Sequence, residues 1–116
     1  MATVWETTQA ALTSLGWPMG ASAYIPGTPG GDLPDNYLVY FVVDVSPIEH
    51  ADDVEKTRSW LVQVSVYSRV GLTGLPDVIG AMTGAGLTFV GGRELDYDSE
   101  TRHFGIAFDF DYSEDI

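Results

Sequence analysis

The densest group of side chains that could do chemistry lies in one acidic stretch near the middle of the chain. It combines carboxylates with a histidine: Asp44, Glu49, His50, Asp52, Asp53 and Glu55. Carboxylate oxygens are the ligands that Ca²⁺ prefers, so the stretch is a candidate site for a hard cation. A calcium loop, however, needs alternating Asp or Asn, a central Gly and a distal Glu, and this spacing is absent. We therefore interpret the stretch as a solvated connector and expect no metal ion or other cofactor.

The other candidates for catalysis are weaker. His103 is expected on the surface, because the sequence contains one other histidine and no cysteine to assist it as a base or a ligand. The segments FVGG and PGTPGG lack the lysine and the following helix of a phosphate-binding loop. No pair of nucleophile and base is visible, so we predict that the protein is not an enzyme.

Length and charge narrow the class of protein. The chain has 116 residues, no cysteine and a formal net charge of −12, from 17 acidic and 5 basic residues. This length fits a single domain, residues 1–116, with one core. The acidic excess opposes sequence-specific binding of nucleic acid, because phosphate contacts need Lys and Arg. No apolar run is long enough to span a membrane and the N-terminus lacks the basic region of a signal peptide, so we expect a protein made in the bacterial cytoplasm.

Two helices and one long loop are predicted. Thr3 and Glu6 form a capping-box pattern that begins a helix over about residues 3–15, and Gly16 ends it. A second, short helix is expected within residues 72–86, where apolar residues recur at helical spacing. Residues 18–36 hold so much Gly and Pro that neither periodicity survives, so they are expected to form a long irregular loop.

Four strands are predicted, and two of them surround the acidic stretch. Residues 37–45 form an apolar run rich in β-branched side chains, and residues 58–69 alternate apolar and polar side chains. The connector between them, residues 46–57, is expected to project from the sheet. Further strands are predicted at residues 87–95 and 102–112. In the last strand one face is aromatic and apolar and is expected to pack on the helices: Phe104, Ile106, Phe108, Phe110 and Tyr112.

The order of these elements predicts an α+β fold. Helix, strand, strand, helix, strand, strand is the order expected of a four-stranded, largely antiparallel sheet with two helices packed on one face. The other face of the sheet is expected to remain partly free, because Gly105 and Ala107 leave flat backbone there. Exposed apolar area of this kind often marks association.

Six residues are candidates for contacts with other proteins. They belong to the long loop and the acidic connector, the two segments outside the predicted sheet that are long enough to reach beyond the domain. The candidates are Tyr24, Ile25, Glu49, Asp52, Asp53 and Glu55.

A series of sequence blocks over about residues 34–112 carries a family resemblance. The series begins with PDNYLVYFVV, the acidic ADD and RSWLVQVSVYSR, continues with a short helix and an FVGG turn, and closes on FDFDY. In this order the blocks resemble the small tail-completion and tail-terminator proteins of long-tailed phages, a family that includes tail-to-head joining proteins.

The resemblance implies a structural virion protein rather than a catalyst. Such a subunit forms a ring, most often sixfold, on the last ring of the tail tube at the head-proximal end of the tail. Its implied partners are further copies of itself, the tail tube protein and the head connector protein. An acidic ring around a channel would repel passing DNA and let it slide. The alternatives are an acidic mimic of DNA, which a regular stripe of acids on one face would favour, and another small protein-binding domain.

Overall fold

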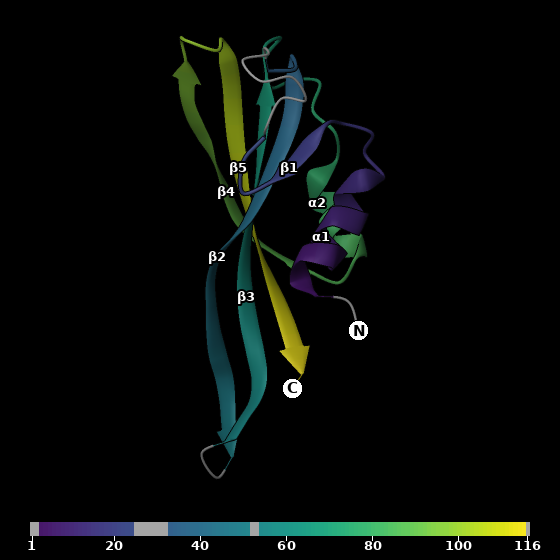
Figure 1. The fold of residues 1–116 in the computed structure, drawn as a ribbon, viewed down its shortest axis with the longest axis vertical. Coiled ribbons are helices and arrows are strands. Elements are labelled where there is room, and N and C mark those ends of the chain that lie inside the picture. Colours follow the sequence, from purple (N-terminus) through teal and green to yellow (C-terminus); the bar gives the residue numbers. More distant parts are fainter. Residues whose placement is uncertain (1–2, 25–32, 52–53, 116) are drawn as a thin grey trace.

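A computed structural model describes residues 3–24, 33–51 and 54–115 as an elongated molecule with principal-axis extents of 52 × 29 × 24 Å (Figure 1). Two helices and five strands are found in these residues. In chain order they are α1 (Val4–Thr13), β1 (Met19–Ala21), β2 (Asn36–Ala51), β3 (Val54–Ser68), α2 (Val78–Gly84), β4 (Thr88–Asp98) and β5 (His103–Asp115).

The strands form one mixed sheet in the order β1-β2-β3-β5-β4. β1 runs parallel to β2, while the other neighbours are antiparallel. The prediction of a four-stranded sheet is therefore wrong, because a fifth strand forms inside the expected loop. β1 spans only Met-Gly-Ala, too short to show any periodicity, and its place depends on long-range backbone hydrogen bonds such as Leu38 N to Pro18 O, 2.8 Å, and Ser22 N to Tyr40 O, 2.7 Å.

β2 and β3 continue far beyond their predicted ends. The sequence predicts a connector over residues 46–57, but the two strands stay paired through it as far as Ala51 opposite Val54. This prediction is wrong because a strand shows apolar alternation only where one of its faces packs on a core. Residues 46–57 carry no such alternation, so they resemble a loop in sequence although they are paired. Pro47 is paired with Arg58 in this ladder. A proline is tolerated there because one side of β2 is an edge.

The helices begin where local signals place them. The capping box of α1 is confirmed, since Thr3 N donates to Glu6 Oε1 and Glu6 N donates to Thr3 Oγ1, both at 3.1 Å. The hydrogen bond from the Thr3 backbone lowers the pKa of Glu6 below its usual value. α2 begins after Asp77, whose Oδ1 accepts from Gly80 N at 2.9 Å, and it spans less of residues 72–86 than predicted.

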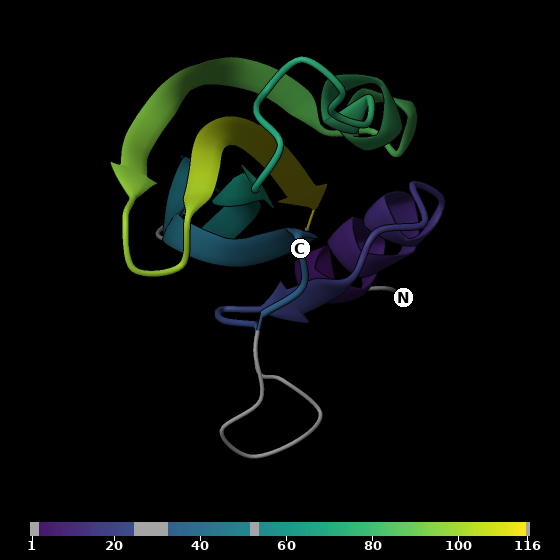
Figure 2. The ribbon, with the colours of Figure 1, turned by 90° about the horizontal axis from the view of Figure 1, so that it is seen from above.

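Both helices lie on one side of the sheet, and the core fills the space between them and the strands. Seen along the long axis, the strands curve and α1 and α2 lie next to one another on one side (Figure 2). α1 contacts β2 and α2, and α2 contacts β4. The core consists of Val4, Leu12, Leu38, Tyr40, Val62, Val64, Val66, Val78, Met82, Leu87 and Phe110.

The predicted packing of the last strand is confirmed except at one end. Phe110 is fully buried, and Ile106, Phe108 and Tyr112 pack against the core. Phe104, at the start of β5, is 40% exposed and instead contacts Tyr97 of β4, with ring centroids 4.7 Å apart. The aromatic pattern extends beyond the helices because the strands are longer than the helices that cover them.

The face opposite the helices is less open than predicted. Gly105 and Ala107, expected to leave flat exposed backbone, are both buried. The side chains of Tyr67 and Leu95, on the two strands that flank β5, lie so close over Gly105 that an added Cβ would be 3.1 and 3.2 Å from their carbons. Larger neighbours on both sides thus cover Gly105.

Candidate functional site

The most distinctive feature of the molecule is the distal part of the β2–β3 hairpin, which extends beyond both helices (Figure 1). β1 pairs with β2 only from Leu38 to Tyr40. β5 accompanies β3 as far as Thr57, which pairs with Asp115. Beyond these points the hairpin consists of two strands with little support from the rest of the domain. It is therefore the part of the described chain that reaches furthest from the core.

The six predicted interface residues divide between the two ends of β2. Glu49 and Glu55 are positions in the strand ladder near the hairpin tip, where Glu49 pairs with Thr57 and Glu55 with His50. Asp52, Asp53 and Ile25 lie outside the described residues. Tyr24 lies at the opposite end of β2, where its ring packs on Tyr37 with centroids 5.3 Å apart. The structure therefore brings Glu49 and Glu55 to the same end of the molecule and separates them from Tyr24.

An aromatic contact supports the base of the projecting hairpin. The indole of Trp60 on β3 meets Trp5 of α1 edge to face, with centroids 5.4 Å apart, and its Nε1 donates to Glu114 Oε1 at 3.2 Å. The guanidinium of Arg58 lies 5.9 Å from the Trp60 ring centroid, a distance at which a cation–π attraction operates. Trp60 pairs across the ladder with Val45, which is exposed. Apolar surface thus continues from the core onto the helix side of the hairpin.

Polar side chains connect the strands on the face opposite the helices. Gln63 Nε2 donates to Asp109 Oδ1 at 3.1 Å, and Asp109 Oδ2 lies 3.5 Å from Arg93 Nη1. Ser59 Oγ donates to Asp111 Oδ1. Two acidic side chains of β5 are thus held by groups of the same chain. They do not form an unpaired acidic stripe, which is the arrangement that would favour a DNA mimic.

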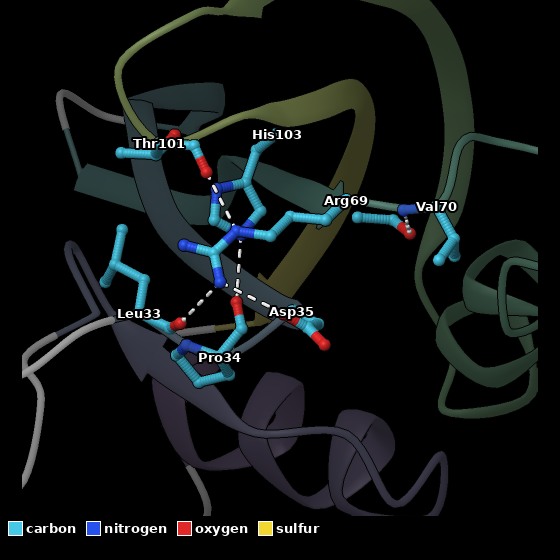
Figure 3. A network of polar contacts seen from close by, with 8 residues as sticks. Leu33, Pro34, Asp35, Arg69, Val70, Thr101 and His103 are labelled. Atoms are coloured by element: carbon cyan, nitrogen blue, oxygen red, sulfur yellow. Dashed lines mark hydrogen bonds and ion pairs between the residues drawn. The ribbon is translucent and has the colours of Figure 1, made fainter.

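A second polar cluster ties the end of the long loop to the sheet, at the end of β2 remote from the hairpin tip. Arg69 Nε donates to the carbonyl oxygen of Thr101 at 2.8 Å, and Arg69 Nη1 donates to the carbonyl of Leu33 at 3.2 Å and to Asp35 Oδ1 at 3.0 Å. Figure 3 shows Arg69 between these groups, with His103 beside them. One arginine therefore connects the residues before β2, the end of β3 and the turn before β5.

His103 is fully buried in this cluster, so its predicted surface position is wrong. Its ring meets Tyr37 edge-on with centroids 5.1 Å apart, and Tyr37 stacks on Tyr67 at 4.8 Å. Burial raises the pKa of Tyr37, with Tyr67 and Asp98 acting in the same direction. Tyr37, Tyr67 and His103 thus form a packed aromatic cluster that holds the ends of β2, β3 and β5 together.

Among the described residues no enclosed pocket is found and no three His, Cys, Asp or Glu side chains gather closely enough to hold a metal ion. Neither α1 nor α2 is long and apolar enough to cross a membrane. No protein-family model and no curated protein matches the sequence. The surfaces of the chain itself are therefore the guide to its function.

Sequence reasoning missed the anchoring roles of Arg69 and His103. Each is a single polar residue at a strand terminus, and its partners lie more than thirty residues away along the chain. They are backbone carbonyls, such as those of Thr101 and Pro34, and for Arg69 also the side chain of Asp35. A backbone carbonyl leaves no mark in the sequence. The available signal is Arg69 itself, one of the five basic residues of the chain, at the end of a strand that alternates apolar and polar side chains.

Proposed function

We propose that this protein is a structural subunit of a phage tail. It caps the head-proximal end of the tail tube as a ring of identical copies and provides a surface for the head connector protein. In this proposal the subunit acts by association and performs no turnover, and its location is the virion. The ordered series of sequence blocks between residues 34 and 112 is the origin of the proposal.

The observation that supports it best is the projecting β2–β3 hairpin. A two-stranded hairpin on its own is marginally stable in water, because it buries little apolar surface. The distal residues of this hairpin gain little from the core of their own domain. In this proposal, contacts with a neighbouring subunit or with the tail tube stabilise the distal part of the hairpin. The acidic mimic receives less support, because Asp109 and Asp111 are engaged within the chain.

A shortened hairpin tests the proposal. Ser46 and Ser59 are paired in the ladder, so residues 47–58 can be replaced by Asn-Gly, which forms a two-residue hairpin turn between them. This change removes four of the six predicted interface residues and leaves every residue of the core in place. We expect an unchanged melting curve and the loss of capping. The readouts are the length of tails assembled without their own terminator, seen by electron microscopy, and the infectivity after heads are added.

A full-length control separates reach from charge. In it Glu49, Asp52, Asp53 and Glu55 become Gln or Asn, so that the length of the hairpin is preserved while its acidic charge is lost. If this control caps tails and the shortened chain does not, capping depends on the length of the hairpin and not on its acidic charge. Failure of the wild-type protein to cap tails would overturn the proposed function, and normal capping by the shortened chain would remove the hairpin tip from the contact.

A further inference from the structure

Two strands of the sheet have a free edge among the described residues. β4 is the last strand, so the whole of Thr88–Asp98 pairs with β5 on one side only. At the other end of the sheet, β1 covers β2 no further than Tyr40, and residues 41–51 have no described partner on their outer side. Unpaired N–H and C=O groups along such an edge are a ready template for another strand.

Both edges carry only part of the usual protection against strand addition. β4 has charged side chains and a register shift, and β2 has a register shift and, after residue 46, Pro47. Natural edges are commonly blocked by Lys or Pro, and neither occurs in β4 or in residues 41–46 of β2. Both edges instead expose apolar side chains at a bulge. Val43, at the register shift in β2, is 48% exposed, and Val90, at the register shift in β4, is 61% exposed. Association would cover these residues.

We propose that copies of this chain associate head to tail, with β4 of one copy adding to residues 41–46 of β2 of the next. The strand directions fit this arrangement. β2 is antiparallel to β3, β3 to β5, and β5 to β4, so β4 runs opposite to β2 within one sheet. Copies in the same orientation therefore meet as an antiparallel pair and extend the sheet. Because the two contacting surfaces differ, repeated addition produces a ring or a filament.

Side chains on the two edges match face by face. On the helix side, Val45 is in register with Trp60 and Phe89 with Phe110, so both edges present apolar groups there. On the opposite side, β2 presents Asp44, and β4 presents Arg93, the only basic residue on either of these two segments. Joining the edges thus brings apolar groups together on one face and opposite charges together on the other.

Charge also favours the pairing of β4 with β2 of a second copy over a symmetrical pairing of two β4 strands. Two β4 edges paired antiparallel about Asp96 would place Asp96 opposite itself and Glu94 opposite Asp98 of the other copy. Like charges opposite one another on paired strands destabilise the pair. The second copy is therefore expected to present its β2 edge to β4 and not its own β4.

The absence of cysteine allows a direct test in solution. Val43→Cys and Val90→Cys are prepared as two separate full-length proteins and treated with a flexible bismaleimide, at about 0.15 M salt, where the Debye length is about 8 Å and repulsion between acidic copies is screened. We expect each protein alone to remain largely uncrosslinked and an equal mixture to give a crosslinked dimer. Val70, 83% exposed and on neither edge, provides the control. A mixture of Val43→Cys with Val70→Cys should give little dimer.

An added charge tests whether the edge itself is used. Val45→Lys, introduced into the Val43→Cys protein, places a lysine on the β2 edge and should abolish the dimer in the mixture with Val90→Cys. Val70→Lys in the same background should leave the dimer intact. No dimer in the original mixture, or dimers from either single protein alone, would overturn the head-to-tail pairing. The proposed function is tested separately, because tail capping and crosslinking are independent readouts.

Discussion

Nε2 of His103 donates a hydrogen bond to the carbonyl oxygen of Pro34, 2.9 Å away, and so connects the first residue of β5 to the segment that enters β2. The other ring nitrogen, Nδ1, is buried without a hydrogen-bond partner among the described residues. The imidazole therefore serves the fold through one hydrogen bond and through its contacts with Tyr37 and Tyr67.

His103→Phe should destabilise the protein although it preserves an aromatic ring. The substitution leaves the partly buried Pro34 carbonyl without its donor, and the loss of such a hydrogen bond costs about 0.5–1.5 kcal/mol. Urea unfolding of the variant and the wild type measures the difference. Ser99→Ala, in the exposed turn before β5, is the control and should lie within about 0.5 kcal/mol of wild type. Equal stability of His103→Phe and wild type would show that the hydrogen bond contributes nothing.

Two phenylalanines of β5 should respond very differently to truncation. Phe110 is fully buried in the core, whereas Phe104 is 40% exposed beyond the helices. Phe110→Ala should cost about 3–5 kcal/mol, the loss typical of a buried aromatic side chain. Phe104→Ala removes a ring of the same size at a partly solvated site and should cost clearly less. Thermal melts of the two variants provide the comparison, and equal losses would contradict the assigned core.

The turn between β4 and β5 should contribute stability that depends on pH. Asp98 Oδ1 accepts from Thr101 N at 3.3 Å and from Glu100 N at 2.9 Å, and these bonds lower the pKa of Asp98 from its usual 3.8. A lowered pKa in the folded state gives a contribution that is complete above the unfolded-state pKa and is lost as the pH falls through the folded one. Wild type should therefore melt above Asp98→Ala at about pH 7, and this gap should narrow below about pH 3.5. A gap that stays constant across this range would exclude the charge of Asp98 as its source.

Two backbone positions should respond in opposite directions to exchange between glycine and a larger residue. Arg102 has φ 61° and Gly16 has φ 75°, both in the left-handed region that glycine tolerates best. Arg102→Gly relieves the Cβ crowding at an exposed site and should be neutral or stabilise by up to about 1 kcal/mol. Gly16→Ala introduces that crowding and should destabilise by about 1 kcal/mol. Chemical denaturation measures both, and a shift of the same sign in the two variants would contradict this explanation.

Much of the sheet could be predicted from the sequence, because its strands carry the patterns that burial imposes. Alternation in β3 and β5 reflects one face on the helices, and the capping box of α1 is a local signal. β1 could not be predicted in this way. Its three residues acquire strand geometry only from pairing with β2, a contact that depends on the rest of the fold.

The candidate surfaces were harder to predict than the fold. The sequence of residues 46–57 has no apolar periodicity and therefore predicts a loop, whereas Glu49 and Glu55 are strand positions. The free edges of β2 and β4 depend on the order of strands in the sheet, which no local pattern encodes. Tyr24, a predicted interface residue, contacts the ring of Tyr37 within its own chain.

The strand order also bears on how the chain folds. β2 with β3 and β4 with β5 are hairpins formed by neighbours in sequence, and hairpins of this kind form within about 1–10 μs. The contact that unites them, β3 with β5, closes a far larger loop, as between Val64 and Phe108. The chain loses loop-closure entropy before it gains the contacts between β3 and β5. The joining of the two hairpins should therefore limit the folding rate. Destabilising substitutions in the contact between β3 and β5 should then slow folding. Those in the distal part of the β2–β3 hairpin should mainly raise the unfolding rate.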